Sequence, residues 1–140
     1  MNIEETNQLT LDFGKIGKIG ATCPTVIPVA VQNADTREVI LVAYTNEEAM
    51  REAFAKRKLI LWSTSRNKHW FKGETSGETF DLLEAYVNCE QNSLLYLVRP
   101  FPAGARHGIC HTRNARGEPR RGCFYRRIDL DTLELRNENP

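Results

Sequence analysis

Three cysteines and a histidine are the residues of this chain best suited to metal chemistry. Cys89, Cys110 and Cys123 are separated by 20 and 12 residues, and His111 directly follows the second cysteine. Thiolates bind zinc tightly, and three protein ligands leave the fourth tetrahedral position to water, which is the pattern of a catalytic zinc site. The gaps are not those of paired zinc knuckles, so spacing alone leaves both a metal site and unliganded thiols open.

His111 is the candidate general acid–base. A neutral imidazole beside an activated water can accept its proton and return it to a leaving nitrogen. His107, four residues earlier, is an alternative, because as a fourth ligand it would close the site and make it structural. Its position favours a solvent-exposed loop residue instead. Cys23, beside Pro24, has no metal-ligating neighbour in the sequence and is interpreted as a spare small residue.

Two glycines allow the backbone to bend in a polar loop with the sequence Lys-Gly-Glu-Thr-Ser-Gly. Thr75, Ser76 and the backbone amides of this loop could cradle a phosphate, with Lys72 and the preceding Arg66 as its cations. Glu74 is a candidate second proton carrier, or a hydrogen-bond partner of a substrate ring nitrogen. An equally good interpretation is that Glu74 only pairs with a nearby cation.

Aromatic and basic residues also occur around this loop. Trp62 and Trp70 could stack on a flat substrate ring, although packing in the core is the commoner fate of tryptophan. Further cations that could bind phosphate groups are Arg113, Arg116, Arg120, Arg121, Arg126 and Arg127. A run of charge is more often a solvated surface, so both interpretations stay open for these arginines.

These motifs resemble the phosphoribosyl-AMP cyclohydrolase family, whose members open the adenine ring of a purine nucleotide by hydrolysis in histidine biosynthesis. The resemblance covers most of the chain and is carried by Leu11-Asp12-Phe13, Ile27-Pro28, Val31 to Asp35, Ala43-Tyr44, Asn46 to Ala49, Trp62-Ser63, Ser65-Arg66, Trp70, Lys72 to Gly77, Cys110-His111 and Cys123-Phe124-Tyr125. It implies hydrolysis of the N1–C6 bond of phosphoribosyl-AMP. It also implies a homodimer with shared active sites, in which Cys89, Cys110 and Cys123 from different subunits bind zinc and His111 is catalytic.

The chain departs from this family around the first cysteine. The family has Asp-Cys-Asp-x-Asp, whose carboxylates hold magnesium, whereas this chain has Asn88, Glu90 and Asn92 at the corresponding positions. Magnesium prefers anionic oxygen ligands, so we expect this site to be weak or empty. Thr45, Thr64 and extra residues in both gaps between the cysteines are further departures. They leave open a paralogous zinc hydrolase with a different purine-like or amidine substrate.

The hydrophobic pattern predicts an α+β fold with a mostly antiparallel sheet and one main helix. Thr45 as N-cap with Glu48 three residues later predicts the start of that helix. Side-chain alternation in the strand ending at Cys89 places Cys89 on one face and Asn88, Glu90 and Asn92 on the other. The predicted strands span 26–31, 38–44, 59–63, 78–89, 93–99 and 123–130, with Pro100 ending the fifth.

The bulk composition indicates a single domain over residues 1–140. Residues 1–24 are expected to form a loosely ordered arm, in which Gly14, Gly17 and Gly20 break any helix and Leu11 and Phe13 provide an anchor. Residues 101–122 form an inserted basic loop, and the tail from Asn137 is expected to fray.

The balance of 19 Lys and Arg against 18 Asp and Glu predicts neither a nucleic-acid nor a membrane partner. Four cysteines without a signal peptide or membrane span indicate a cytoplasmic protein with metal ligands or spare thiols rather than disulfides. A non-catalytic zinc or nucleic-acid-binding module remains an alternative. It requires a closed four-ligand zinc with His107 or Cys23 as the fourth ligand.

Overall fold

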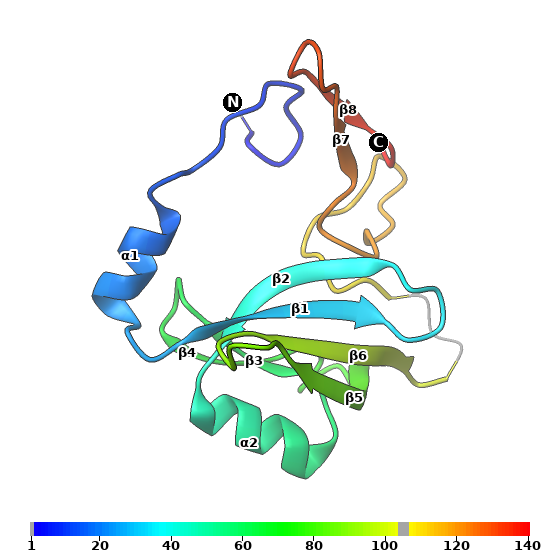
Figure 1. Cartoon of the computed structure of the whole chain (residues 1–140). Coiled ribbons are helices and arrows are strands. Elements are labelled where there is room, and N and C mark those ends of the chain that lie inside the picture. The colour runs from blue at the N-terminus through cyan, green and yellow to red at the C-terminus, as the bar shows by residue number, and fades with distance from the viewer. Residues whose placement is uncertain (1, 104–106) are drawn as a thin grey trace.

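A computed structural model describes residues 2–103 and 107–140 of the chain. Its centre is a six-stranded sheet in the order β4-β3-β2-β1-β6-β5, seen edge-on in Figure 1. The strands of this sheet are β1 (Ile27–Asn33), β2 (Val39–Thr45), β3 (Ile60–Ser63), β4 (Lys68–Phe71), β5 (Thr79–Val87) and β6 (Leu94–Phe101). β1 and β6 pair in parallel, and every other neighbouring pair is antiparallel. The predicted α+β class with a mostly antiparallel sheet is confirmed.

Helix α2 (Glu47–Lys56) packs on one face of the sheet, as Figure 1 shows. Ala49 and Ala53 are buried, and the core beneath them is built from apolar side chains of β1, β2, β3, β5 and β6. The predicted N-cap was wrong by one residue: the Asn46 side chain accepts the hydrogen bond from the Ala49 N–H at 2.9 Å. Thr45 is instead the buried last residue of β2.

The N-terminal segment contains a helix, α1 (Lys15–Thr22), so the prediction that its glycines exclude helix was wrong. Interior glycine costs about 1 kcal/mol relative to alanine, which weakens a helix but does not forbid it. The helix is attached through its buried Ile19 and through Cys23, whose sulfur lies 3.2 Å from the Asn67 side-chain oxygen. Leu11 and Phe13 are exposed and do not provide the expected anchor.

Local contacts also place the ends of other strands at residues different from the predicted ones. β5 ends at Val87 and not at Cys89, because the Asn88 side chain accepts hydrogen bonds from the N–H groups of Asn92 and Ser93 and closes a turn. β6 continues through Pro100, which lies beyond the end of β1, where the missing N–H interrupts no pairing with that strand. β4 was not predicted, because residues 68–71 were assigned to the polar loop.

The C-terminal strand predicted over 123–130 is the shorter β7 (Arg126–Ile128), which forms a hairpin with β8 (Leu135–Asn137), a strand that was not predicted. The tail is held and not frayed, because the Asn139 backbone oxygen accepts a hydrogen bond from Arg120. In Figure 1 this hairpin and the N-terminal segment lie together on the side of the sheet opposite α2. The two ends of the chain therefore form one structural unit with the loop that carries Arg120.

Arg120 is the central contact of this unit, with only 1% of its surface exposed. Its guanidinium forms two hydrogen bonds with the Glu5 carboxylate and lies 4.1 Å from the centre of the Tyr125 ring. We predict that Arg120→Met loosens the N-terminal segment by about 3 kcal/mol, the low end for breaking a buried ion pair, because Glu5 keeps access to water. Backbone amides of residues 2–9 should then exchange roughly 100-fold faster in hydrogen–deuterium exchange.

The matched control is Arg116→Met on the same loop, which breaks an exposed pair with Glu118 and should change the exchange rates of residues 2–9 very little.

Acid should also release the N-terminal segment, because hydrogen bonds from Arg120 hold the pKa of Glu5 below its ordinary value of 4.5. The stabilisation is complete above this value and is lost as pH falls through the lower, folded-state pKa. Glu5→Gln should remove this pH dependence, and a segment that exchanges equally slowly in all variants would contradict the prediction.

Candidate functional site

Cys110, His111 and Cys123 line one cavity of about 430 Å³. The rest of its wall comes from β2, from the hairpin of β3 and β4, and from the first residue of α1. The contributing residues are Lys15, Leu41, Val42, Ala43, Tyr44, Trp62, Ser63, Thr64, Ser65, Arg66, Trp70 and Ile109. Segments more than 90 residues apart in the sequence therefore place two thiols, an imidazole, aromatic rings and cations around one space.

A folded-back loop brings Cys110 and Cys123 together despite the residues inserted between them. The Asn114 side-chain oxygen accepts hydrogen bonds from the N–H groups of Arg116 and Glu118 and closes the turn. The returning chain then passes so close to Gly108 that a Cβ there would lie 2.0 Å from the Arg120 carbonyl oxygen. Cys123 is fixed to β2, because its N–H donates to the Ile40 carbonyl at 2.7 Å.

The two thiols interact directly. Although Cys123 as a residue is exposed, burial around its sulfur and the adjacent Cys110 raise its pKa to about 12. Cys110 is itself buried, and its sulfur lies 3.0 Å from the Thr112 hydroxyl. Two adjacent thiols suit a soft cation, because zinc binds cysteine as thiolate and stabilises that charge.

Cys89 is not part of this cavity. It is exposed in the turn after β5, and β1 and β6 separate β5 from β2, where Cys123 is attached. Within residues 2–103 and 107–140 of a single chain, no three His, Cys, Asp or Glu side chains are grouped as metal ligands. One chain thus supplies two of the three predicted zinc ligands at this cavity.

The side chains of Asn88 and Asn92 are hydrogen-bonded to each other. The Asn88 side-chain nitrogen donates to the Asn92 side-chain oxygen at 2.7 Å, and the Asn88 oxygen accepts from two backbone N–H groups at 2.9 Å. Glu90 is exposed at the surface of the same turn. The amide oxygens that magnesium would need are already hydrogen-bonded, so these residues fit a magnesium ion poorly.

Some of the predicted substrate-binding residues line the cavities around Cys110 and His111, and the others do not. Arg66 and Trp70 line the cavity of the two thiols, and Lys72 lines an adjoining cavity that also includes Cys110 and His111. Glu74, Thr75 and Ser76 are exposed and line neither of these cavities. The charge of Glu74 instead acts on Lys56 of α2, where it contributes to raising the lysine pKa after the larger effect of Glu52.

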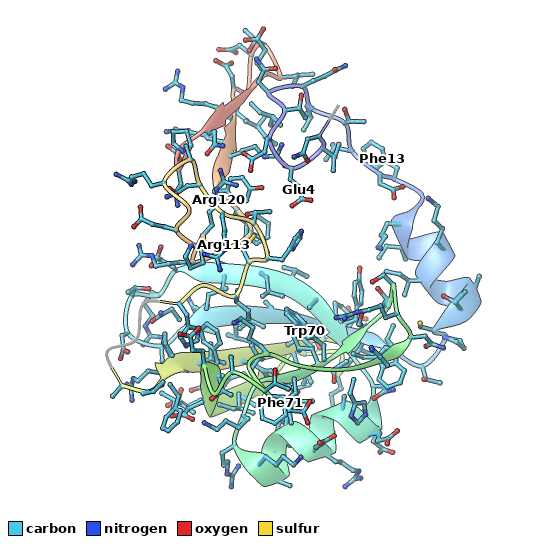
Figure 2. The ribbon with its side chains drawn as sticks, turned by 180° about the vertical axis from the view of Figure 1, so that it is seen from behind. Glu4, Phe13, Trp70, Phe71, Arg113 and Arg120 are labelled. Atoms are coloured by element: carbon cyan, nitrogen blue, oxygen red, sulfur yellow. The ribbon has the colours of Figure 1, made fainter. Side chains whose placement is uncertain are left out.

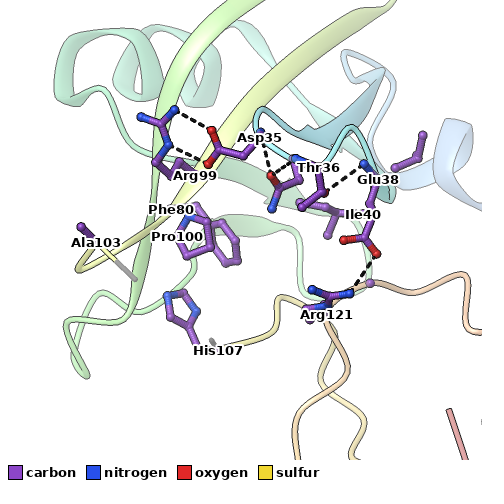
Figure 3. A pocket seen from close by; sticks show the side chains of 13 residues that line it. Asp35, Thr36, Glu38, Ile40, Phe80, Arg99, Pro100, Ala103, His107 and Arg121 are labelled. Carbon is purple, nitrogen blue, oxygen red and sulfur yellow. Dashed lines mark hydrogen bonds and ion pairs between the residues drawn. The ribbon is translucent and has the colours of Figure 1, made fainter. Parts of the chain in front are cut away.

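His107 is buried, so its predicted exposure was wrong. Its ring lies edge-on to Phe80, and its Nε2 is 3.3 Å from the Phe101 carbonyl oxygen. It lines the adjoining cavity of Lys72, Cys110 and His111, and also a separate cavity of about 270 Å³ whose arginines are already paired, Arg99 with Asp35 and Arg121 with Glu38 (Figure 3). Within the described part of the chain, neither His107 nor Cys23 is grouped with Cys110 and Cys123 as a metal ligand.

Four arginines of the inserted loop make contacts within the chain. Arg113 donates to the Gly117 carbonyl, and the other three pair with carboxylates, namely Arg116 with Glu118, Arg120 with Glu5 and Arg121 with Glu38. This arrangement favours a structural role over a nucleic-acid surface.

Lys15, which lines the cavity, and Glu4, whose carboxylate lies 2.8 Å from His111, are charged residues near the site that were not predicted. Both lie in the segment interpreted as a loose arm, and no motif there marked them.

Comparison with known proteins identifies the family. The family model described as phosphoribosyl-AMP cyclohydrolase matches residues 41–125, which is more than half of the chain. The chain belongs to this family. A phosphoribosyl-AMP cyclohydrolase of Nitrosopumilus maritimus is 40% identical over 119 residues, which cover 84% of this chain and 93% of that protein. One of Hyphomonas neptunium is 36% identical over 94% of this chain and 86% of that protein.

A histidine biosynthesis bifunctional protein of Caldanaerobacter subterraneus is also 36% identical, over 81% of this chain and 51% of its own length. Membership of the family makes the chain a cyclohydrolase enzyme. Among the described residues, no helix is both long and apolar enough to cross a membrane.

Proposed function

We propose that this protein hydrolyses the N1–C6 bond in the adenine ring of phosphoribosyl-AMP, a step of histidine biosynthesis. The observation that carries the proposal is the cavity that joins Cys110, Cys123 and His111 to Arg66 and aromatic side chains. It brings two thiols, an imidazole and cations together in a space of about 430 Å³, which is within the usual range for small-molecule sites.

We infer that zinc is held by Cys110 and Cys123 of one chain and Cys89 of a second copy. The donor set fits zinc, since three thiolates are soft ligands and leave one tetrahedral position open. When bound, zinc supplies a nucleophilic water at neutral pH by lowering the pKa of that water. His111 would accept a proton as this water attacks C6 and would return it to the departing N1.

A homodimer is supported by apolar surface around Cys89. The second half of β5 is an edge strand on which Leu83, Tyr86 and Val87 are 43%, 54% and 56% exposed. Phe13 on the N-terminal segment is 91% exposed. Long apolar edges favour pairing with another chain, and a second copy that covers β5 would lie next to Cys89.

The substrate would be held by cations on two sides of the cavity. Arg66 follows β3 and Lys15 begins α1, and both suit the two phosphate groups of phosphoribosyl-AMP. Trp70 would contact the purine, and Lys72 would act from the adjoining cavity. We place the enzyme in the cytoplasm, because a reducing compartment keeps Cys89, Cys110 and Cys123 available as zinc ligands.

Turnover of phosphoribosyl-AMP by the zinc-loaded protein, followed as ring-opened product, tests the proposed function. We further predict that this turnover is the same without magnesium and at millimolar magnesium. The bonded pair of Asn88 and Asn92 needs no cation, whereas carboxylates at these positions would repel each other without one. The variant Asn88→Asp/Glu90→Asp/Asn92→Asp should acquire magnesium dependence.

The matched control is Gln91→Asp, which adds charge to the same turn outside the three ligand positions. Strong magnesium dependence of the unchanged protein would contradict the prediction. If the unchanged protein shows no turnover and only the triple variant is active, the native substrate is a different purine-like or amidine compound. The hydrogen-bonded amide pair is the observation that supports this second candidate.

A further inference from the structure

We propose that Glu4, on the N-terminal segment, is a positioning residue that orients His111 for catalysis. The inference rests on the proposed function, because it assumes that His111 carries the proton in the reaction. Its starting point is one contact: the His111 Nε2 lies 2.8 Å from a carboxylate oxygen of Glu4. Figure 2 shows Glu4 projecting from the N-terminal loop toward the sheet.

His111 needs such a contact, because little else restrains its ring. Its side chain is 80% exposed, although the adjacent Cys110 is buried and fixed. An exposed imidazole samples several rotamers, whereas catalysis requires one nitrogen at a defined position. A carboxylate that accepts a hydrogen bond from one ring nitrogen fixes both the orientation and the tautomer of the ring.

The nitrogen that faces Glu4 determines which tautomer the contact would favour. Since a carboxylate only accepts hydrogen bonds, Glu4 would favour the neutral His111 ring that carries its proton on Nε2. Nδ1 is then the nitrogen with a free electron pair. It would receive the proton of the attacking water, while Glu4 holds the opposite side of the ring.

The backbone around Glu4 is held firmly enough for this role. The Tyr125 hydroxyl donates to the Glu4 carbonyl oxygen at 2.7 Å, and Arg126 donates to the carbonyl oxygens of Ile3 and Thr6 at 2.8 and 2.9 Å. The next residue, Glu5, makes the buried pair with Arg120. These anchors use backbone atoms or a neighbouring side chain, so the Glu4 side chain can be changed without removing them.

The test compares Glu4→Ala and Glu4→Gln with the unchanged, zinc-loaded enzyme. We expect Glu4→Ala to lower kcat about 10-fold with little change in KM, the smaller effect seen when a partner that orients an active-site group is removed. Glu4→Gln keeps an uncharged acceptor and should recover part of the lost rate. Glu134→Gln is the matched control, because it removes a carboxylate from the turn between β7 and β8 and should leave kcat unchanged.

A double variant separates this inference from the proposed function. If Glu4 acts through His111, Glu4→Ala/His111→Ala should be no slower than His111→Ala alone. Additive losses, or full activity of Glu4→Ala while His111→Ala is slow, would overturn the role of Glu4 alone. Full activity of His111→Ala would remove both His111 and Glu4 from the mechanism, whereas no turnover of phosphoribosyl-AMP by the unchanged enzyme would overturn the proposed function instead. Nitrogen-15 chemical shifts of the His111 ring give a readout without substrate, and an unchanged tautomer in Glu4→Ala would also contradict the inference.

Discussion

Replacing Cys110 by serine is expected to remove zinc from the protein and to reduce turnover to background. A hydroxyl is a poor substitute for a thiolate as a ligand to zinc, and Cys110 is a buried member of the thiol pair. Elemental analysis of metal-replete protein measures the first effect, with about one zinc per chain expected for the unchanged enzyme and little for Cys110→Ser. The prediction fails if the unchanged protein has no zinc or if the variant keeps it fully.

Cys23→Ser is the matched control, because Cys23, at the end of α1, is also buried but contacts Asn67 in the turn between β3 and β4. Serine can make the same hydrogen bond, so zinc content and turnover should both be retained.

Mixing inactive subunits then tests whether the site is shared. If Cys89 of one chain completes the site of another, a mixed dimer of Cys89→Ser and Cys110→Ser contains one site with both changes and one intact site. Random exchange of subunits should restore about one quarter of full activity, because half of the dimers are mixed and each of these has one working site. No recovery in dimers shown to be mixed would assign all the zinc ligands to one chain.

The sequence predicted those parts of the fold that depend on local periodicity. The hairpin of β1 and β2, the main helix and the strands that became β5 and β6 follow from alternating or helical apolar patterns. The ends of these elements depend on single side chains that compete for backbone groups. Asn46 caps α2 in place of Thr45, and Asn88 ends β5 before Cys89.

Only those site residues that belong to a sequence motif could be predicted, and their arrangement in space could not. The sequence marked Cys89, Cys110, Cys123 and His111 as candidate site residues. The closeness of Cys110, His111 and Cys123 depends on how the inserted loop folds back against Arg120. Glu4 could not be predicted for a different reason, because a glutamate near an N-terminus carries no spacing or composition signal. Its position beside His111 comes from contacts with residues more than 100 positions away, which a pattern within one segment cannot report.

Replacing His111 by alanine is expected to slow hydrolysis about 100-fold, which is within the usual range for a lost general acid–base. Zinc content should be nearly unchanged, because in this assignment the ligands are the three cysteines. Stability should also change little, since a side chain that is 80% exposed contributes little packing. The measurements are kcat with saturating phosphoribosyl-AMP, zinc per chain, and the midpoint of thermal unfolding.

His69→Ala is the control that separates this effect from a general loss of imidazole. His69 pairs with Glu52 of α2 at 2.8 Å and does not line the cavity, so its removal should leave kcat unchanged. If His111→Ala loses zinc, His111 is a ligand and the proton carrier must be another group. If kcat is fully retained, His111 has no part in the mechanism. A slow variant that retains zinc and regains rate when free imidazole is added would identify the missing group as a proton carrier rather than a structural one.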